Sequence, residues 1–339
     1  MVDVRAPQPP VPAPDRNLAL DLVRVTEAAA MAGGRWVGRN DARGALSAAI
    51  TAMRTMVGTV DMVGTVVVGE GTPEDPVRIA AGERIGSGTG AAYDVALDPV
   101  DGIMLTAKGL SNAVSVLAVA PHGAMLDLSG CAGMTTLVAG REVRDHVDIR
   151  KPVAENIQRV AKLTHRHPED ITVAMLARPH HEPLAREVRD AGARVRFLTC
   201  GAVTAAIMAA SPRSGIDLMI GNVGTAESVI AACAVKSLGG TLQGHLDPQT
   251  DEERAWLAGA GLDEKTVLGR EDFARGDDAF FVLTGITDGG LVRGIQYGPD
   301  TATTESLVMR ARSGTIRRMQ SEHRLDQLAR YSAVDYLHQ

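Results

Sequence analysis

Acidic residues follow apolar runs at three places in the sequence, and each place is rich in glycine. The stretches are VVVGEG (66–71), VALDPVDG (95–102) and IGNVGTAES (220–228). Their acidic residues are Glu70, Asp98, Asp101 and Glu227. Open α/β sheets bind ligands at the carboxyl ends of their strands, so these side chains are expected to gather there. Gathered carboxylates repel one another unless a hard cation such as Mg²⁺ or Mn²⁺ neutralises them, which predicts a divalent-metal site.

The same residues also have a simpler interpretation as capping groups. Asp98 and Asp101 could serve in a turn and at a helix start, and Glu227 could be a favourable charge in the first turn of a helix. For any one residue, capping is the commoner role. Capping does not explain why all three stretches end an apolar run, so we favour the metal site for the set.

The segment DPVDG (98–102) carries a further chemical signal. Proline fixes the turn between the two aspartates, and Gly102 lets an oxyanion approach backbone N–H groups at the start of a helix. This arrangement is typical of metal-dependent hydrolysis of phosphate esters, in which cations hold the phosphate while water attacks.

The spacing of apolar residues predicts the elements that must position these groups. Helical spacing begins after Asp15, which could cap a helix, and recurs at 44–57, 152–164, 182–190, 202–210 and 225–237. Short apolar strands are expected at 65–69, 93–98, 113–120, 135–139, 171–176, 194–198, 216–221 and 241–246. In the second half, strands alternate with helices. This alternation predicts an α/β fold with βαβ units and a doubly wound, mostly parallel sheet.

Changes in composition suggest how the chain is divided. The expected parts are a disordered Pro-rich tail (1–14), an N-terminal α/β half with the metal site (15–150), a C-terminal α/β half that binds substrate (151–325) and a C-terminal tail (326–339). Residues 247–279 are charged and expected to be rich in loops, and a basic helix is expected after residue 317.

The composition narrows the class of protein. The chain has 339 residues, a formal net charge of −6 and 45% apolar residues, which is ordinary for a globular protein that buries a core. The mild acidity argues against nucleic acid or an anionic membrane as a partner, because both require a basic face. No apolar run approaches the roughly 18 residues of a membrane helix. Three cysteines without a CxxC spacing fit a reduced cytoplasm and exclude a disulfide framework.

Taken together, the motifs resemble those of the class II fructose-1,6-bisphosphatases, members of the lithium-sensitive sugar and inositol phosphatase superfamily. The resemblance runs from about Arg16 to Leu325 and includes DRNLALDLVRVTEAAAMAGGRWVGRND, KGLSNAVSVLAVA, ATTESLVMRARSGTIRR and QSEHRL. It implies an alternating αβαβα sandwich and a cytoplasmic homo-oligomer (dimer or tetramer). It also implies hydrolysis of the 1-phosphate of fructose 1,6-bisphosphate, a step of gluconeogenesis, with Mg²⁺ or Mn²⁺ as cofactor. The implied metal ligands are Glu70, Asp98, Asp101 and Glu227.

Two positions depart from the family in the chemistry that activates water. The family's second aspartate, five residues after that of its GRGD segment, is here Leu46. The threonine that follows DPxDG in the family is here Ile103. In the family these side chains cooperate to polarise the attacking water, whereas an aliphatic side chain can neither accept a proton nor bind a cation. Asp41 would lie on a different helix face from Leu46, so it is not expected to replace the missing carboxylate. Thr106 could share the face of Ile103 if a helix starts at Gly102, but we do not favour it as a replacement for the missing threonine.

The substrate positions implied by the resemblance are also altered. The family's Arg-His-Asp cluster is here Pro179-His180-His181-Glu182, and its Asp-Gly-Asp loop is Cys200-Gly201-Ala202. The positions carried over as substrate contacts are Gly102, His180, His181, Glu182, Gly201 and Gly224. The adjacent histidines could instead form a partly solvated loop, and Cys200 could be a packing residue rather than a nucleophile. The basic stretch Arg310–Arg318 could contact phosphate from a neighbouring subunit or form a solvated face.

Three functions remain open on the sequence. The chain could be a working fructose-1,6-bisphosphatase, a phosphatase altered toward a different sugar phosphate, or a non-catalytic relative that binds a metabolite or a partner subunit. The four carboxylates favour a phosphatase, and the joint loss of both water-activating groups favours the non-catalytic alternative. We predict a divalent-metal-dependent sugar-phosphate phosphatase that is weakened or changed in substrate.

Overall fold

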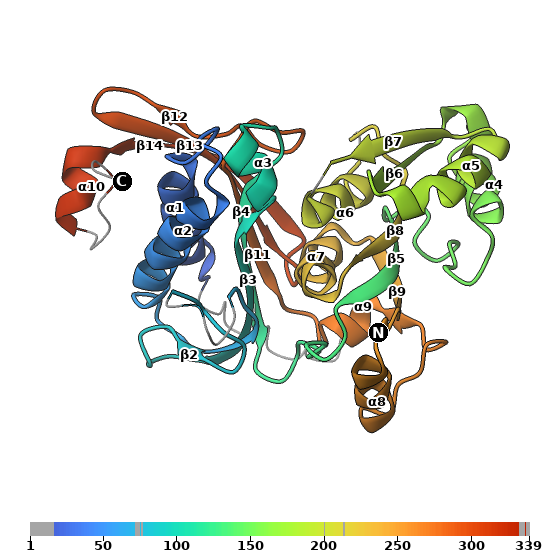
Figure 1. Ribbon diagram of the computed structural model, residues 1–339, viewed down its shortest axis with the longest axis horizontal. Helices are drawn as coiled ribbons and strands as arrows, with labels where there is room; N and C mark the ends of the chain where they lie inside the picture. The colour runs from blue at the N-terminus through green and yellow to red at the C-terminus, as the bar shows by residue number, and fades with distance from the viewer. Residues whose placement is uncertain are drawn as a thin grey trace, which may run out of the picture.

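Helices and sheets stack in alternating layers that run from left to right in Figure 1. The structure is a computed structural model that describes residues 17–71, 75, 77–199, 201–212, 214–331 and 336. The predicted tail (1–14), Asp15 and Cys200 lie outside the described residues. The layer order is helix, sheet, helix, sheet, helix, so the expected αβαβα sandwich is confirmed.

The outer helices α1 (Ala19–Gly34) and α2 (Ala42–Val57) cover one face of the first sheet. Apolar side chains of both helices, including Leu22 and Met53, are fully buried against that face. The sheet has the order β12-β13-β11-β4-β3-β1-β2, with β14 paired to β13. Its strands are β1 (Val63–Val68), β2 (Arg84–Ile85), β3 (Ala92–Asp101), β4 (Val114–Pro121), β11 (Phe280–Gly285), β12 (Gln296–Tyr297), β13 (Thr301–Arg310) and β14 (Thr315–Arg324).

The central layer lies between the two sheets and consists of α6 (Ala202–Ala210) and α7 (Thr225–Leu238). Every residue of α6 is buried. A helix that is apolar on all sides is expected where sheets cover it from both directions. Both helices contribute to the apolar cluster that fills the space between the two sheets.

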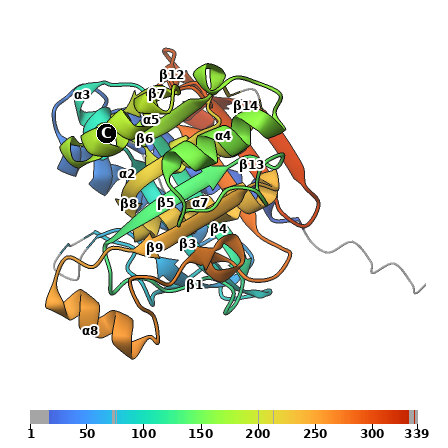
Figure 2. The same ribbon diagram turned by 90° about the vertical axis from the view of Figure 1, so that its right-hand side faces the viewer.

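The second sheet has the order β10-β9-β5-β8-β6-β7. Its strands are β5 (Gly133–Ala139), β6 (Thr172–Leu176), β7 (Arg194–Leu198), β8 (Leu218–Gly224), β9 (Thr241–Leu246) and β10 (Leu268–Gly269). Its outer face is covered by α4 (Val153–Leu163) and α5 (Glu182–Asp190), which lie in front of the sheet in Figure 2. In α4, Val153, Ile157 and Val160 recur at helical spacing and form the buried face.

The second sheet is mixed, and it departs from the expected mostly parallel sheet at β5 and β10. The strands β7, β6 and β8 pair parallel. The strand β5 pairs antiparallel with both β8 and β9, so β9 runs in the same direction as β8, and β10 pairs antiparallel with β9. The reason is long-range: β5 comes from the first half of the sequence and enters the sheet between two strands of the second half. Alternation along the sequence could not reveal that insertion.

The C-terminal segment also differs from expectation. Residues 315–324 form the strand β14 rather than a basic helix, and only the short helix α10 (Leu325–Tyr331) follows. Gly314, at a φ of 59°, turns the chain so that β14 pairs with β13 along its whole length. The charged segment 247–279 is loop-rich but contains α8 (Asp251–Gly259) and α9 (Arg270–Phe273).

Each sheet draws strands from both sides of residue 150. The strand β5 precedes that position and joins the second sheet, whereas β11 to β14 follow it and join the first. The predicted division at 150 therefore divides the sequence but not the sheets. In the part of the chain that is described, no helix has the length and apolar character needed to cross a bilayer.

Candidate functional site

The four predicted metal ligands lie where the first sheet meets the central helices. Glu70 follows β1, and Asp98 and Asp101 lie at the carboxyl end of the neighbouring strand β3. Because β1 and β3 are parallel, both strands end at the same edge of the sheet. Glu227 comes from the first turn of α7, a helix that packs against β3 and β4. The fold thus brings together three stretches that are far apart in sequence.

The DPVDG segment adopts the compact turn that its proline suggested. The pairing of β3 with β4 shifts between Asp98 and Asp101, which marks a bulge at Pro99 and Val100. Asp98 Oδ1 accepts a hydrogen bond of 2.9 Å from the Val100 N–H. Gly102, at a φ of 91°, then begins the short helix α3 (Ile103–Lys108). The local geometry therefore holds both aspartates toward the central layer.

The carboxylates influence one another electrostatically. Burial, followed by the charges of Asp101 and Glu70, raises the pKa of Asp98 well above its usual range. Burial and then the charge of Glu227 raise the pKa of Asp101 to about 7, against a lowering effect of the Val203 N–H. Burial also raises the pKa of Glu70, with a smaller contribution from Glu227. The three carboxyl groups with raised pKa values and the neighbouring Glu227, whose charge contributes to each shift, form a single cluster, which we call the carboxylate cluster.

The carboxylate cluster has the donor chemistry of a hard-cation site. Asp101 is buried, and its Oδ2 has no hydrogen-bond partner within the described structure. An unpartnered buried carboxylate oxygen is costly and is the kind of atom that a cation satisfies. Among the described residues, however, no three His, Cys, Asp or Glu side chains converge closely enough to hold one ion. The donors therefore fit Mg²⁺ or Mn²⁺ in type and neighbourhood, and their side chains must rotate to share an ion.

Glu227 is held close to the start of its own helix. A Cβ placed on Gly224 would lie 1.9 Å from Glu227 Oε2, so any other residue at this position would displace the carboxylate from its present place. Gly224 is also the residue that precedes the first turn of α7. This glycine, predicted as a substrate contact, therefore has a steric role beside Glu227 in the fold.

At the N-terminus of α6, sequence reasoning named Gly201 as a substrate contact but missed Val203 and Thr204. Gly201, at a φ of 86°, begins α6, and the Val203 N–H of its first turn interacts with Asp101. Thr204 in the same turn is buried, and its hydroxyl has no hydrogen-bond partner in the described structure. N–H groups at a helix start are suited to binding anions. The glycine at 201 was the only signal in the sequence.

Leu46 and Ile103 lie in an apolar corner formed by α2 and α3, which pack on each other. Both side chains are partly buried against the α1–α2 core. The neighbouring polar groups are engaged elsewhere: Asp41 accepts a hydrogen bond of 2.8 Å from the Gly44 N–H and caps α2. Thr106 is fully buried, with its hydroxyl 3.5 Å from the Gly102 carbonyl oxygen. Neither Asp41 nor Thr106 therefore takes over the position of Leu46 or Ile103.

His181 is buried and uses both ring nitrogens within the fold. Its Nδ1 lies 2.8 Å from the Leu176 carbonyl oxygen, and its Nε2 accepts a hydrogen bond of 2.8 Å from the Asn222 N–H. Burial lowers its pKa, which keeps the ring neutral. A substrate contact by His181 would require the ring to give up one of these bonds. The neighbours differ: the exposed His180 packs edge-on against His181, and the half-buried Glu182 pairs with Arg189 at 3.3 Å.

Comparisons with known proteins agree with this architecture and chemistry. The family model described as "Bacterial fructose-1,6-bisphosphatase, glpX-encoded" matches residues 16–323. The "Fructose-1,6-bisphosphatase 1 class 2" of Escherichia coli (strain K12) is 37% identical over 324 residues, covering 92% of this chain and 96% of that protein. The "Fructose-1,6-bisphosphatase class 2" of Shigella flexneri matches with the same identity and coverage. The chain therefore belongs to the family of bacterial class II fructose-1,6-bisphosphatases.

Proposed function

We propose that this chain is a divalent-metal-dependent sugar-phosphate phosphatase whose hydrolysis of fructose 1,6-bisphosphate is weak. The main support is the carboxylate cluster, with its unpartnered Asp101 oxygen beside the N-terminus of α6. Buried like charges without a structural partner are unfavourable to the fold and are typical of functional sites. Members of this family are phosphoric monoester hydrolases that depend on a divalent metal.

In this proposal the chain's residues divide the work of binding. Glu70, Asp98, Asp101 and Glu227 would hold Mg²⁺ or Mn²⁺, which supplies positive charge to a phosphate ester. Backbone N–H groups at the starts of α6 and α7 donate hydrogen bonds toward phosphate oxygens, and the glycines at 201 and 224 let the ester approach them. Substrate roles for Gly102, His180 and Glu182 are part of the same proposal.

The weak step is the activation of water. Leu46 and Ile103 offer no group that could take a proton, and Asp41 and Thr106 are engaged in the backbone of α2 and α3. General-base assistance is worth about 10² to 10⁴ in rate, so a deficit of that size is expected. A sugar phosphate with a better leaving group or a different geometry would depend less on this assistance.

The test is release of inorganic phosphate from fructose 1,6-bisphosphate and from a panel of sugar monophosphates, with Mn²⁺, with Mg²⁺ and with a chelator. We expect turnover that requires the metal, disappears in Asp98→Asn, and on fructose 1,6-bisphosphate runs at least about 100-fold below the Escherichia coli relative. Turnover equal to that of the relative would show that the loss of the two water-activating groups does not matter.

A non-catalytic role is the second candidate, and the apolar corner favours it. The joint replacement of two cooperating groups by Leu46 and Ile103 is expected when hydrolysis is no longer required. In that case sugar phosphates would raise the melting temperature of the protein without any release of phosphate under any metal condition. Release of phosphate that is lost in Asp98→Asn would exclude this second candidate.

A further inference from the structure

Thr204 is a buried polar residue to which the proposed function gives no role. The residue is only 3% exposed, and its hydroxyl has no hydrogen-bond partner within the described structure. A buried hydroxyl without a partner is unfavourable to the fold, and such a group in a native protein needs an explanation. Packing and ligand binding are the two explanations to compare.

Packing alone does not account for this threonine. Thr51, Thr55 and Thr164, which also lie in helices or at their ends, each donate to the carbonyl oxygen four residues earlier at 2.8 or 2.9 Å. Thr204 makes no such bond, and it is the only polar residue of α6. An apolar residue would fill the same space without leaving a buried hydroxyl unpaired.

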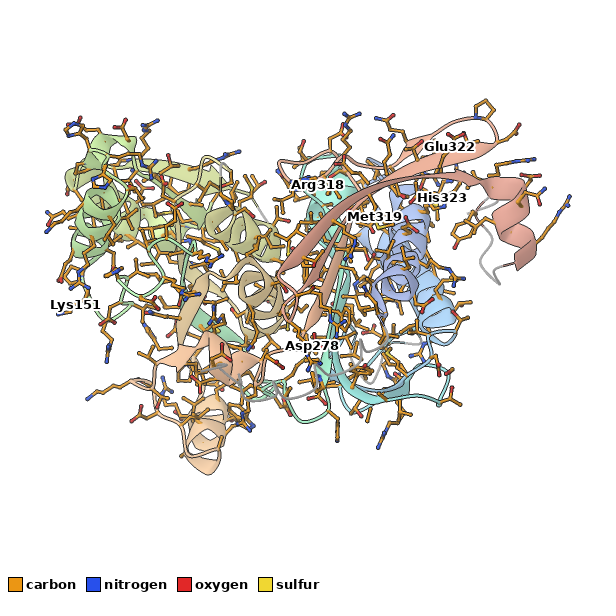
Figure 3. All side chains as sticks on the ribbon, turned by 180° about the vertical axis from the view of Figure 1, so that it is seen from behind. Lys151, Asp278, Arg318, Met319, Glu322 and His323 are labelled. Carbon is orange, nitrogen blue, oxygen red and sulfur yellow. The ribbon has the colours of Figure 1, made fainter. Side chains whose placement is uncertain are left out.

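The position of α6 places this hydroxyl near the carboxylate cluster. In Figure 3, Met319 on β14 marks the side of the first sheet, and Lys151, just before α4, marks the far side of the second sheet. The helix α6 lies in the layer between the two sheets. In its first turn, the Val203 N–H interacts with Asp101 at the end of β3. The unpartnered hydroxyl therefore belongs to the residue next to the one that contacts the cluster.

A hydroxyl and a carbonyl group border the side of Gly201 on which another residue would carry its side chain. A Cβ placed on Gly201 would lie 3.6 Å from Thr204 Oγ1 and 3.6 Å from the Asn112 carbonyl oxygen. Because glycine has no side chain, this direction stays open to a ligand. Asn112 is fixed in place, since its N–H donates to the Asp288 carbonyl oxygen at 2.9 Å and its Oδ1 accepts from the Gly290 N–H at 3.0 Å.

We propose that Thr204 and the Asn112 carbonyl oxygen together bind a sugar hydroxyl of the phosphate ester beside Gly201. The Thr204 O–H donates to the oxygen of the ligand hydroxyl, and the ligand hydroxyl donates to the Asn112 carbonyl oxygen. A doubly ionised phosphate has no proton to donate to a carbonyl, so this pair selects a hydroxyl over a second phosphate. The inference rests on the proposed function, because a phosphate bound at the helix starts brings the attached sugar next to Gly201.

Thr204 is not among the positions carried over from the family. The acidic residues of the family's loop at this point are replaced by Cys200 and Ala202, and Thr204 follows two residues later in the first turn of α6. Its neutral hydroxyl can bind a ligand hydroxyl without adding a negative charge near Asp101. This makes Thr204 a residue that determines specificity, with no part in the activation of water.

The experiment compares the binding of two ligands to the full chain by calorimetry with Mn²⁺. One ligand is fructose 1,6-bisphosphate, and the other is hexane-1,6-diyl bisphosphate, which carries both phosphates but no hydroxyl. Thr204→Val removes the hydroxyl at nearly constant volume and should weaken the binding of fructose 1,6-bisphosphate by about tenfold, the effect of one hydrogen bond. It should leave the affinity for hexane-1,6-diyl bisphosphate unchanged. Thr204→Ser keeps the hydroxyl and should bind both ligands as the unmodified chain does.

The matched control is Thr65→Val, because Thr65 on β1 also has a buried hydroxyl without a partner in the described structure. It should leave both affinities unchanged. Thermal melting without ligand should show that neither valine variant is less stable than the unmodified chain, since each loses an unpaired buried hydroxyl.

Three results would overturn the inference. They are an unchanged affinity of Thr204→Val for fructose 1,6-bisphosphate, an equal loss of affinity for both ligands, and a failure of the unmodified chain to bind fructose 1,6-bisphosphate. If the expected pattern of binding is found but no phosphate is released with any metal, this inference is supported and only the proposed hydrolysis is contradicted. The two failures are therefore distinguishable.

Discussion

The carboxylate cluster and the apolar corner are joined in the sequence at Gly102, which lies between Asp101 and Ile103, yet they differ in chemistry. In the carboxylate cluster, burial and neighbouring charges raise the pKa of Asp98 and Asp101, and one oxygen of Asp101 has no hydrogen-bond partner among the described residues. In the apolar corner, Leu46 and Ile103 pack against the core, and the nearby polar groups of Asp41 and Thr106 are satisfied. One region is unfavourable to the fold without a ligand, and the other contributes to its stability.

Under the proposed function, this difference would make binding and water activation separable on one scaffold. Carboxylates that are buried close together repel one another and do not stabilise the fold. A cluster of this kind therefore indicates a ligand. The apolar corner gains hydrophobic burial and offers no proton acceptor. Mutations can therefore alter one region while the other serves as an internal reference.

The largest effect is expected from breaking the carboxylate cluster. Asp98→Asn combined with Asp101→Asn should abolish Mn²⁺ binding, because two charged oxygen donors are lost from a hard-cation site. The same variant should raise the free energy of unfolding without metal, since it removes buried like charges. Calorimetry with Mn²⁺ and chemical denaturation in a chelator measure the two effects. Asp251→Asn on exposed α8 is the control, and unchanged Mn²⁺ binding in the double variant would refute the metal site.

The second effect is a gain of function in the apolar corner. Leu46→Asp with Ile103→Thr should raise the rate of phosphate release from fructose 1,6-bisphosphate by about 10² to 10⁴, and each single change should give much less. Both changes place a polar side chain at a partly buried position, so a lower free energy of unfolding is also expected. Met104→Thr with Leu110→Asp adds the same side chains at exposed positions and serves as control. No gain in rate would place the defect in the substrate pocket.

A third prediction concerns His181 and stability. His181→Ala leaves the Leu176 carbonyl and the Asn222 N–H without their partner, which should lower the free energy of unfolding by about 2 to 4 kcal/mol. His180→Ala, at an exposed position, should change it little.

The stability provided by His181 should also depend on pH. Its folded pKa is lowered by burial from an ordinary value of 6.5, so below that pH the unfolded chain binds the proton more readily than the folded one. The stabilisation that depends on the neutral His181 ring is thus fully present above about pH 6.5 and is lost as the pH falls below that value. His181→Gln should show a smaller loss between neutral pH and pH 5 in denaturation curves. An NMR titration in which the His181 ring protonates at its ordinary pKa would contradict this account.

The smallest effect is expected from a single methyl group beside Glu227. Gly224→Ala places a Cβ 1.9 Å from Glu227 Oε2, and the flexible carboxylate must move away. We expect Mn²⁺ affinity to fall by about tenfold with little change in melting temperature. Gly133 lies opposite Gly224 in the β5–β8 pair, and a Cβ there would meet nothing closer than 3.6 Å, so Gly133→Ala is a matched control. Equal affinities for both variants would mean that Glu227 is not a ligand.

The local pattern of apolar residues, glycines and aspartates was sufficient to predict many of the helices and strands. The predicted helix at 202–210 and strand at 241–246 have the bounds found for α6 and β9, because glycines and an aspartate border their apolar runs. The helix predicted over 44–57 begins only two residues earlier, where Asp41 caps it. Local pattern failed for β14, whose basic residues suggested a helix, since its strand form depends on pairing with β13. It also failed for the direction of β5, which depends on the strands that it joins.

For the candidate site, the residue types and the turn of DPVDG were determined by sequence alone, because proline, glycine and aspartate act on their immediate neighbours. The aliphatic nature of Leu46 and Ile103 was equally plain. Only the tertiary structure placed Glu227 beside Asp101, directed the Val203 N–H toward that carboxylate, and left β14 at the edge of its sheet. These features depend on the order of strands and layers, which arises from contacts between distant segments, and no local propensity encodes that order.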